Sequence, residues 1–205
     1  MPALWIQPEK LLLASTSATR LALLVSAGLP VETQGSGVDE RVVEEAARAE
    51  ALDPPALAAR LAAEKALAVS RRHPERIVLG ADQVLECEGE VFHKPESREA
   101  AQAHLRRLSG RTHVLHSAGA LALGGQVVAP FCSKASLGMR ALTDDAIALY
   151  LDLAGPDVLQ SAGVYQLEGL GVHLFEKVEG DHSTVLGLPL IPLLSALRRL
   201  GCLAF

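Results

Sequence analysis

Cysteines and aromatic side chains are scarce in this sequence of 205 residues, in which aromatics make up 3% and cysteines number three. The cysteines are far apart, odd in number and without a CxxC spacing, which argues against a disulfide framework and against a cysteine-based zinc site. The seven histidines form no HExxH or HxxxH pattern, so a zinc hydrolase is not indicated. A reducing, cytoplasmic location is the expectation that follows.

An excess of positive charge is also missing, since the formal net charge is −5. Long nucleic acids and anionic membranes require a large electropositive face, which this balance does not favour. The arginine pairs at 71–72, 106–107 and 198–199 are interpreted as solvated helix faces. We predict neither a nucleic-acid polymer nor a membrane as partner, and a phosphate site would have to be a local basic pocket.

The sequence also lacks a convincing membrane or export segment. The first ten residues carry no basic region of the kind that begins a secretion signal. Residues 112–133 contain no formal charge and are long enough to span a bilayer. They include histidines and a Gly124–Gly125 pair, however, which predicts a hairpin of two strands and not a membrane helix.

The elements that can be predicted are those of one α/β domain covering residues 1–205. Apolar runs predict strands at 11–14, 31–33, 77–81, 84–86, 90–92 and 172–177, with two more within 112–139. Helical spacing predicts a helix ending near Gly28 and others at 56–72, 97–108, 145–153 and 190–200. Together they indicate a mixed sheet flanked by helices.

The segment Ser15-Thr16-Ser17-Ala18-Thr19-Arg20 is the first candidate for chemistry. Hydroxyls and free amides at the start of a helix can bind an anion, and an arginine can form an ion pair with it. The alternative is an ordinary helix N-cap with a surface arginine.

Acidic residues supply the second candidate. Asp82 follows the predicted buried strand 77–81, and a carboxylate at such a strand end can bind a divalent metal or take a proton from water. Asp39 and Glu40 could complete a carboxylate cluster for Mg²⁺. Taken singly, Asp82 could equally cap a turn, Asp39 and Glu40 could form a solvated loop, and Lys65 and Lys94 could be surface charges.

Eight short segments resemble, in this order along the chain, the Maf nucleotide pyrophosphatases: LLASTSxxR at 12–20, VDE at 38–40, AEKA at 63–66, GADQV at 80–84, GExxxKP at 89–95, LSGRTH at 108–113, SAGVYQLEGLG at 161–171, and EG at 179–180 with VLGLPL at 185–190. Each is short, but the shared order through almost the whole chain makes the resemblance specific.

The resemblance implies a mixed α/β fold like that of inosine triphosphate pyrophosphatases, with two lobes around a central cleft, and a homodimer. It implies that Asp82 is the proton acceptor and that Glu40 is an acid associated with the metal, so that both would hold Mg²⁺, with Mn²⁺ or Co²⁺ as substitutes. The residues that match phosphate-binding positions of the family are Ser15, Ser17, Arg20, Lys65 and Lys94.

Three positions bear on the nucleobase. The sequence has Thr19, Gln83 and Glu168 where the type that acts on thymidine and uridine nucleotides has arginine, threonine and glutamine. These residues resemble the type that prefers 7-methyl-GTP. A carboxylate at 168 would also suit 7-methylguanine, whose ring is cationic and carries N–H donors. The residues 18–19 depart from the usual family pattern.

The function expected from the sequence is hydrolysis of a modified nucleoside triphosphate, chiefly 7-methyl-GTP, to its monophosphate and pyrophosphate, which cleans the nucleotide pool. A pyrophosphatase for dTTP or UTP is the alternative within the family. A nucleotide-binding regulator of cell division or septum formation is the alternative outside enzymology.

Overall fold

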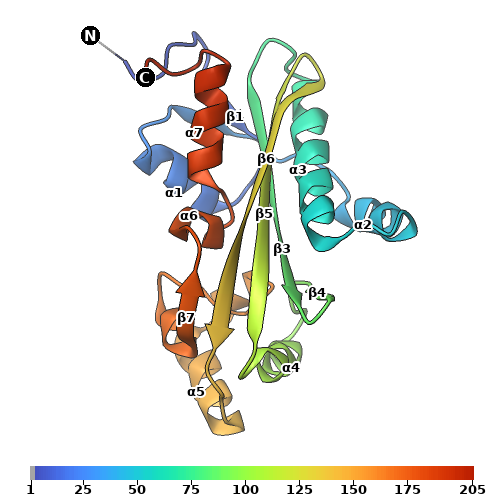
Figure 1. Ribbon diagram of the computed structural model, residues 1–205, viewed down its shortest axis with the longest axis vertical. Coiled ribbons are helices and arrows are strands. Elements are labelled where there is room, and N and C mark those ends of the chain that lie inside the picture. Colours follow the sequence, from blue (N-terminus) through green and yellow to red (C-terminus); the bar gives the residue numbers. More distant parts are fainter. Residues whose placement is uncertain (1–2) are drawn as a thin grey trace. The chain divides into compact units, whose positions relative to one another are not determined.

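The computed structural model describes residues 3–205, and its centre is a mixed sheet of seven strands. The strand order is β2-β1-β3-β5-β6-β7, and β4 pairs with β3 (Figure 1). The strands are β1 Leu11–Leu13, β2 Val31–Thr33, β3 Val78–Cys87, β4 Glu90–Phe92, β5 Thr112–Leu123, β6 Gln126–Met139 and β7 Phe175–Glu179. Strand β1 runs parallel to β2 and β3, whereas β4 and β7 are antiparallel to their neighbours, so the predicted mixed α/β class is confirmed.

The helices are α1 Ala18–Ser26, α2 Glu40–Ala49, α3 Pro54–Ser70, α4 Arg98–Leu108, α5 Asp144–Ala154, α6 His182–Val185 and α7 Leu190–Arg199, with 3-10 turns η1 Pro156–Gln160 and η2 Leu170–Leu174. The chain divides into two compact units. Unit 1 contains residues 1–83, 117–133 and 182–205, and unit 2 contains residues 84–116 and 134–181. In the part of the chain that the structure describes, no helix has the length and apolar character needed to cross a membrane.

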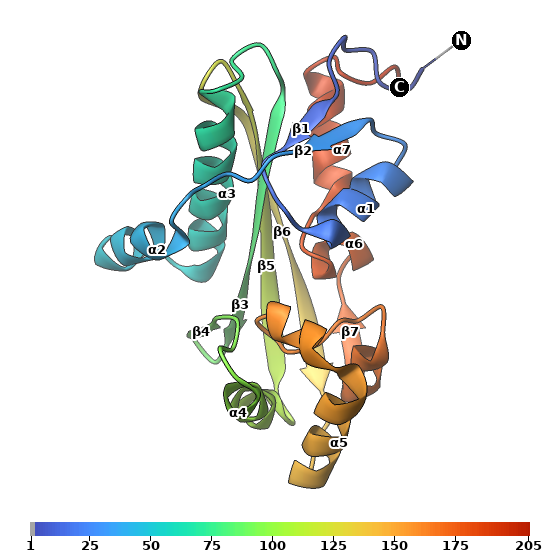
Figure 2. The same ribbon diagram turned by 180° about the vertical axis from the view of Figure 1, so that it is seen from behind.

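Alternating side chains of β1 divide the core of unit 1 into two layers. Leu11 and Leu13 pack with Leu24 of α1 and Leu193 of α7 on one face of the sheet. Leu12, on the opposite face, packs with residues that include Val69 of α3. This alternation is the period of a strand buried on both faces, and Figure 2 shows α1 and α7 on one side of β1 and α3 on the other.

Gly80 of β3 brings the strand into direct contact with the backbone of α3. A Cβ at this position would lie 2.1 Å from the carbonyl oxygen of Ala62 and 2.5 Å from the amide nitrogen of Ala66. The helix can approach this closely only because the strand has no side chain there. The close approach places the next residue of this face, Asp82, beside Lys65 of the helix.

Several predicted elements are corrected by the structure. Strand β3 continues to Cys87, so Asp82 lies in the middle of a strand and not at the carboxyl end of one. Residues 40–49, which were not predicted to be regular, form α2 with Asp39 as its N-cap. The last strand begins at Phe175 instead of 172, because residues 170–174 form η2, and the short helix α6 was not predicted.

Other sequence predictions are confirmed. Residues 112–133 form β5 and the first part of β6, joined by the Gly124–Gly125 turn, and not a membrane helix. Both glycines have positive φ angles, of 60° and 74°, as a tight hairpin turn requires. The helices predicted at 97–108 and 145–153 are α4 and α5, and the structure shows that Ser97 and Thr143 cap them by accepting a hydrogen bond from a backbone amide of the first turn.

His113 lies in a buried aromatic cluster of unit 2. Its Nε2 atom is 2.7 Å from the hydroxyl of Tyr165, its ring also contacts Phe175, and its side chain is 0% exposed. Its Nδ1 atom has no hydrogen-bond partner within residues 3–205. Burial lowers the pKa of His113 from 6.5 to about 4, because a charged imidazolium would lose its hydration here.

His113 is therefore expected to make the folded state sensitive to acid. In the unfolded chain it takes up a proton as the pH falls below 6.5, whereas in the folded chain it stays neutral until about 4. Its contribution to stability is thus complete above pH 6.5 and is lost as the pH falls toward 4. Urea unfolding at pH 7 and pH 5 should show that the wild type loses about 2 kcal/mol more free energy of unfolding than His113→Gln does. An equal loss in the two proteins would contradict this role.

Candidate functional site

The central feature of the site is a lysine held between two carboxylates in unit 1. The Nζ atom of Lys65 lies 2.6 Å from Oδ1 of Asp82 and 2.8 Å from Oε1 of Glu40. Lys65 and Asp82 are both 7% exposed, whereas the side chain of Glu40 is 52% exposed. The cluster joins β3, α3 and α2, and it carries two negative charges and one positive charge.

The environment changes the acidity of Asp82. Burial raises the pKa of Asp82 above its usual value, and the nearby charges of Lys65 and Arg20 partly oppose this effect. Burial also lowers the pKa of Arg20, and this shift is partly offset by the carboxylates of Asp82 and Glu40. A carboxylate with a raised pKa is a better proton acceptor than a solvated one, provided that it stays ionised at the working pH.

The start of α1 presents hydroxyls and an arginine side by side. Ser17 is the N-cap, and its Oγ accepts a hydrogen bond from the backbone amide of Arg20. Nε of Arg20 donates to the carbonyl oxygen of Gly187 at 2.9 Å, and Nη1 donates to Oγ of Ser15 at 3.5 Å. These contacts fix the guanidinium beside the positive end of a helix, an arrangement suited to an anion.

Gln83 follows Asp82 on β3 and occupies the face of the sheet with α1 and α7. Its Nε2 lies 2.8 Å from Oγ of Ser117 and 2.9 and 3.0 Å from the carbonyl oxygens of Thr184 and Val185. Carbonyl oxygens only accept, so the NH₂ group must be the end that faces them. Within residues 3–205, the hydrogen bonds of the Gln83 side chain are all made by its Nε2 and none by its carbonyl oxygen Oε1.

Ser117 and residues 184–187 were not identified as site residues from the sequence. Ser117 is 0% exposed, and its hydroxyl donates to the carbonyl oxygen of Thr184 at 2.7 Å while it accepts from Gln83. The backbone carbonyls of 184–187 hold both Gln83 and Arg20. For these residues the only signal in the sequence was the family segment at 185–190; for Ser117 there was none.

The predicted site residues are divided between the two units. Unit 1 contains Ser15, Ser17, Thr19, Arg20, Glu40, Lys65, Asp82 and Gln83, and unit 2 contains Lys94 and Glu168. Thr19 lies in the first turn of α1 and is half-buried. Glu168 is exposed in the turn that precedes η2, and Lys94 is exposed after β4. Their roles stay predictions.

A metal would have to be shared with the substrate. Within residues 3–205 no three histidine, cysteine, aspartate or glutamate side chains are grouped closely enough to hold a metal. Asp82 and Glu40 supply two carboxylates that already share one cation, the ammonium of Lys65. Mg²⁺ is commonly bound by one or two carboxylates together with substrate phosphates, so these residues fit that ion.

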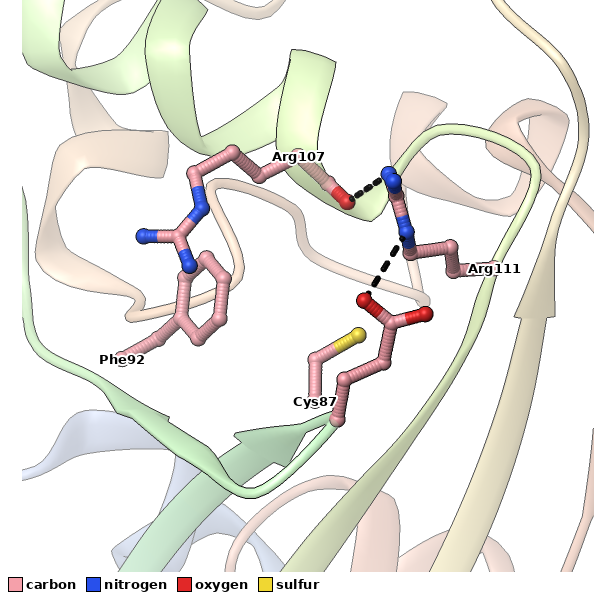
Figure 3. A pocket seen from close by; sticks show the side chains of 5 residues that line it. Cys87, Phe92, Arg107 and Arg111 are labelled. Carbon is pink, nitrogen blue, oxygen red and sulfur yellow. Dashed lines mark hydrogen bonds and ion pairs between the residues drawn. The ribbon is translucent and has the colours of Figure 1, made fainter.

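A cavity of about 270 Å³ lies elsewhere, in unit 2, and is lined by Cys87, Glu88, Phe92, Arg107 and Arg111 (Figure 3). Its arginines already have partners: Arg111 pairs with Glu88 at 3.2 Å, and Arg107 pairs with Glu90 while it lies 4.8 Å over the ring of Phe92. Burial and the charge of Glu88 raise the pKa of the Cys87 thiol, which disfavours the reactive thiolate. None of the predicted site residues lines this cavity.

The fold and the site define an α/β protein in which hydroxyls and a guanidinium at a helix start lie in the same unit as a lysine held between two carboxylates. A family model described as "Maf-like protein" matches residues 10–200. The chain belongs to this family.

Relatives are similar over almost their whole length. A "Nucleoside triphosphate pyrophosphatase" of Nitrobacter hamburgensis is 51% identical, covering 98% of this chain and 99% of its own. A "7-methyl-GTP pyrophosphatase" of Mesorhizobium japonicum is 47% identical over 95% and 98%, respectively, and one of Bartonella henselae is 47% identical over 93% and 95%. A solved HAM1 protein from Coxiella burnetii has 17% identity and a TM-score of 0.37, covering 63% of this chain and 72% of its own, too low a score to show a shared fold.

Proposed function

We propose that this chain is a nucleoside triphosphate pyrophosphatase that prefers 7-methyl-GTP and releases the nucleoside monophosphate and pyrophosphate. The pyrophosphatase activity is supported by relatives of that name at about 50% identity over nearly the full chain. The single observation that carries the chemistry is the Lys65 ammonium between Asp82 and Glu40, in the same unit as Arg20.

In the proposed reaction, water is the nucleophile and Asp82 is its base. The water oxygen forms a bond to the α-phosphorus, the bond from that phosphorus to the bridging oxygen breaks, and pyrophosphate leaves with the electron pair. Asp82 accepts the proton of the water. Ser15, Ser17 and Arg20 bind the phosphates at the start of α1, and Lys65 and Lys94 offset their negative charge.

A divalent metal, proposed to be Mg²⁺ with Mn²⁺ or Co²⁺ as substitutes, would be held by Asp82 and Glu40 and would neutralise charge on the triphosphate. The chain's own contribution is to keep these two carboxylates together. Lys65 does this through a charge-assisted hydrogen bond to Asp82, which is stronger than a neutral one, and an ion pair with Glu40.

The preference for 7-methyl-GTP rests on Thr19, Gln83 and Glu168. Two relatives named 7-methyl-GTP pyrophosphatase, at 47% identity, support the same base. Glu168 is exposed, and a carboxylate attracts the cationic ring of 7-methylguanine. The side chain of Gln83 has a carbonyl oxygen, which suits a base or sugar that carries a hydrogen-bond donor.

Glu168→Gln tests the base preference. It removes the negative charge and keeps the shape, so kcat/KM for 7-methyl-GTP should fall about tenfold relative to GTP, dTTP, UTP and CTP, which corresponds to about 1.4 kcal/mol. The measurement is magnesium-dependent pyrophosphate release from this panel. Glu75→Gln, an exposed glutamate of unit 1, is the matched control and should leave the ratios unchanged.

Other outcomes of the panel decide between the alternatives. If the wild type prefers dTTP or UTP, the chain is a pyrophosphatase of the other type and the role of Glu168 is wrong. If nucleotides bind and none releases pyrophosphate, the chain is a nucleotide-binding regulator of cell division and not an enzyme. A homodimer is proposed with the family resemblance as its support, and a cytoplasmic location with the cysteine pattern as its support.

A further inference from the structure

Glu40 stands at the end of a long connection that has no regular structure. The connection covers residues 34–39, between β2 and α2, and Glu40 is the first residue of α2. Figure 2 shows this connection running past α3 on its way to α2. Because Glu40 must meet Lys65 of α3, the path of the connection sets where the carboxylate lies.

Arg72 holds the middle of this connection. Its Nη2 donates to the carbonyl oxygen of Gly35 at 3.3 Å and to that of Ser36 at 3.1 Å. Its Nε donates to the carbonyl oxygen of Ala68 in the last turn of α3, which keeps the guanidinium aligned with that helix. The planar guanidinium therefore joins the end of α3 to the connection with one rigid group.

Neighbouring contacts do not replace this one. The connection is tied to β1 at its first residue, where the amide of Gln34 donates to Leu13. Among residues 3–205, the hydrogen bonds that reach 35–39 from outside the connection and α2 come from Arg72. Gly37 has a φ angle of 71°, a conformation that favours glycine.

We propose that Arg72 is a positioning residue that holds the connection 34–39 so that Glu40 meets Lys65 and Asp82. Helix α3 then positions Glu40 in two ways. Lys65 binds the carboxylate directly, and Arg72, in the turn just after the helix, holds the backbone that leads to it. Gly35 also lies next to Thr16, since a Cβ on it would be 3.6 Å from Cγ2 of that residue. This inference rests on the role proposed above for Glu40.

The test compares Arg72→Ala with Arg71→Ala. Arg71 is the adjacent exposed arginine, and within the described residues its side chain makes no hydrogen bond or ion pair, so it is a matched control. Hydrogen–deuterium exchange, with neither metal nor nucleotide, should be about fivefold faster or more in peptides covering 35–43 in Arg72→Ala, because loss of about 1 kcal/mol of local stability has that effect. Arg71→Ala should exchange like the wild type.

Activity gives the second measurement. The Mg²⁺ concentration for half-maximal pyrophosphate release should rise several-fold in Arg72→Ala, with a smaller change in kcat at saturating Mg²⁺. Arg72→Lys keeps the positive charge but lacks the planar guanidinium with its several donors. Its half-maximal Mg²⁺ concentration should therefore lie between those of the wild type and Arg72→Ala. A loss of overall stability alone would change the melting temperature without moving the Mg²⁺ requirement.

Each result has a defined meaning. Unchanged exchange in peptides 35–43 overturns the proposal, as does unchanged metal dependence in Arg72→Ala when Glu40→Gln alters it. Faster exchange with unchanged metal dependence in both Arg72→Ala and Glu40→Gln supports the anchoring contact and overturns the role of Glu40 instead.

Discussion

Asp82→Asn should lower kcat for pyrophosphate release by about two to four orders of magnitude, with nucleotide binding largely retained. An asparagine has nearly the same shape as aspartate but cannot accept the proton from water. It also removes one of the two carboxylates that hold the buried ammonium of Lys65. The measurement is single-turnover pyrophosphate release at saturating nucleotide and Mg²⁺.

The pH profile of the wild type provides a second check on Asp82. Burial raises the pKa of Asp82, and a base must be ionised to work, so activity is present above this pKa and is lost as the pH falls through it. The acid limb of kcat/KM should therefore lie at higher pH than for a solvated aspartate, and it should disappear in the residual activity of Asp82→Asn.

Glu45→Gln is the matched control for this experiment. Glu45 is an exposed glutamate on α2, the helix that begins with Glu40, and it has no ion pair within residues 3–205. Its kcat should equal that of the wild type. If Asp82→Asn kept more than a tenth of the wild-type kcat, Asp82 would not be the base.

Gly80→Ala should destabilise the protein by about 3 kcal/mol, at the upper end of what overpacking a core costs. The added methyl would lie 2.1 Å from the carbonyl oxygen of Ala62 and 2.5 Å from the amide of Ala66, so the backbone of α3 has to move away. Lys65 lies between these two residues on α3, and its contact with Asp82 should lengthen. Urea unfolding measures the stability, and kcat should fall in the same variant.

Gly138→Ala shows what the same substitution does where space is available. Gly138 lies in β6, and a Cβ on it would have its nearest neighbours at 3.6 Å, an ordinary contact distance. Its stability should stay within about 0.5 kcal/mol of the wild type. Equal effects of the two substitutions would mean that α3 does not depend on Gly80 for its position.

Local sequence patterns were enough to predict much of the fold. Consecutive apolar residues at 11–13 form a strand buried on both faces, and Gly124–Gly125 forms a hairpin turn. Ser97 and Thr143 begin helices because each side chain accepts a hydrogen bond from an amide a few residues ahead. In each case the interaction that decides the structure lies within a few residues of the pattern.

The predictions of secondary structure were wrong where contacts between residues distant in the sequence determine it. Asp82 was expected to end a strand, since an acidic residue after an apolar run usually does, but a lysine 17 residues earlier in the sequence pairs with it and the strand continues. Asp39 and Glu40 were interpreted as part of a loop and no helix was predicted after them, yet residues 40–49 form a helix that packs on α3. Neither outcome can be derived from the neighbouring sequence.

The sequence by itself therefore determined the mixed α/β class, most of the elements, the family, and the set of residues on which catalysis is proposed to depend. These follow from side-chain periodicity, local capping and an ordered series of motifs. The tertiary structure alone decided that Lys65 lies between Asp82 and Glu40, that Arg20 and Gln83 are held by the carbonyls of 184–187, and that Arg72 anchors the connection to Glu40. The reason is physical: these contacts join residues far apart in the chain, so no local pattern contains them. The contact of Lys65 with Asp82 depends in addition on Gly80, which lets α3 pack directly against β3.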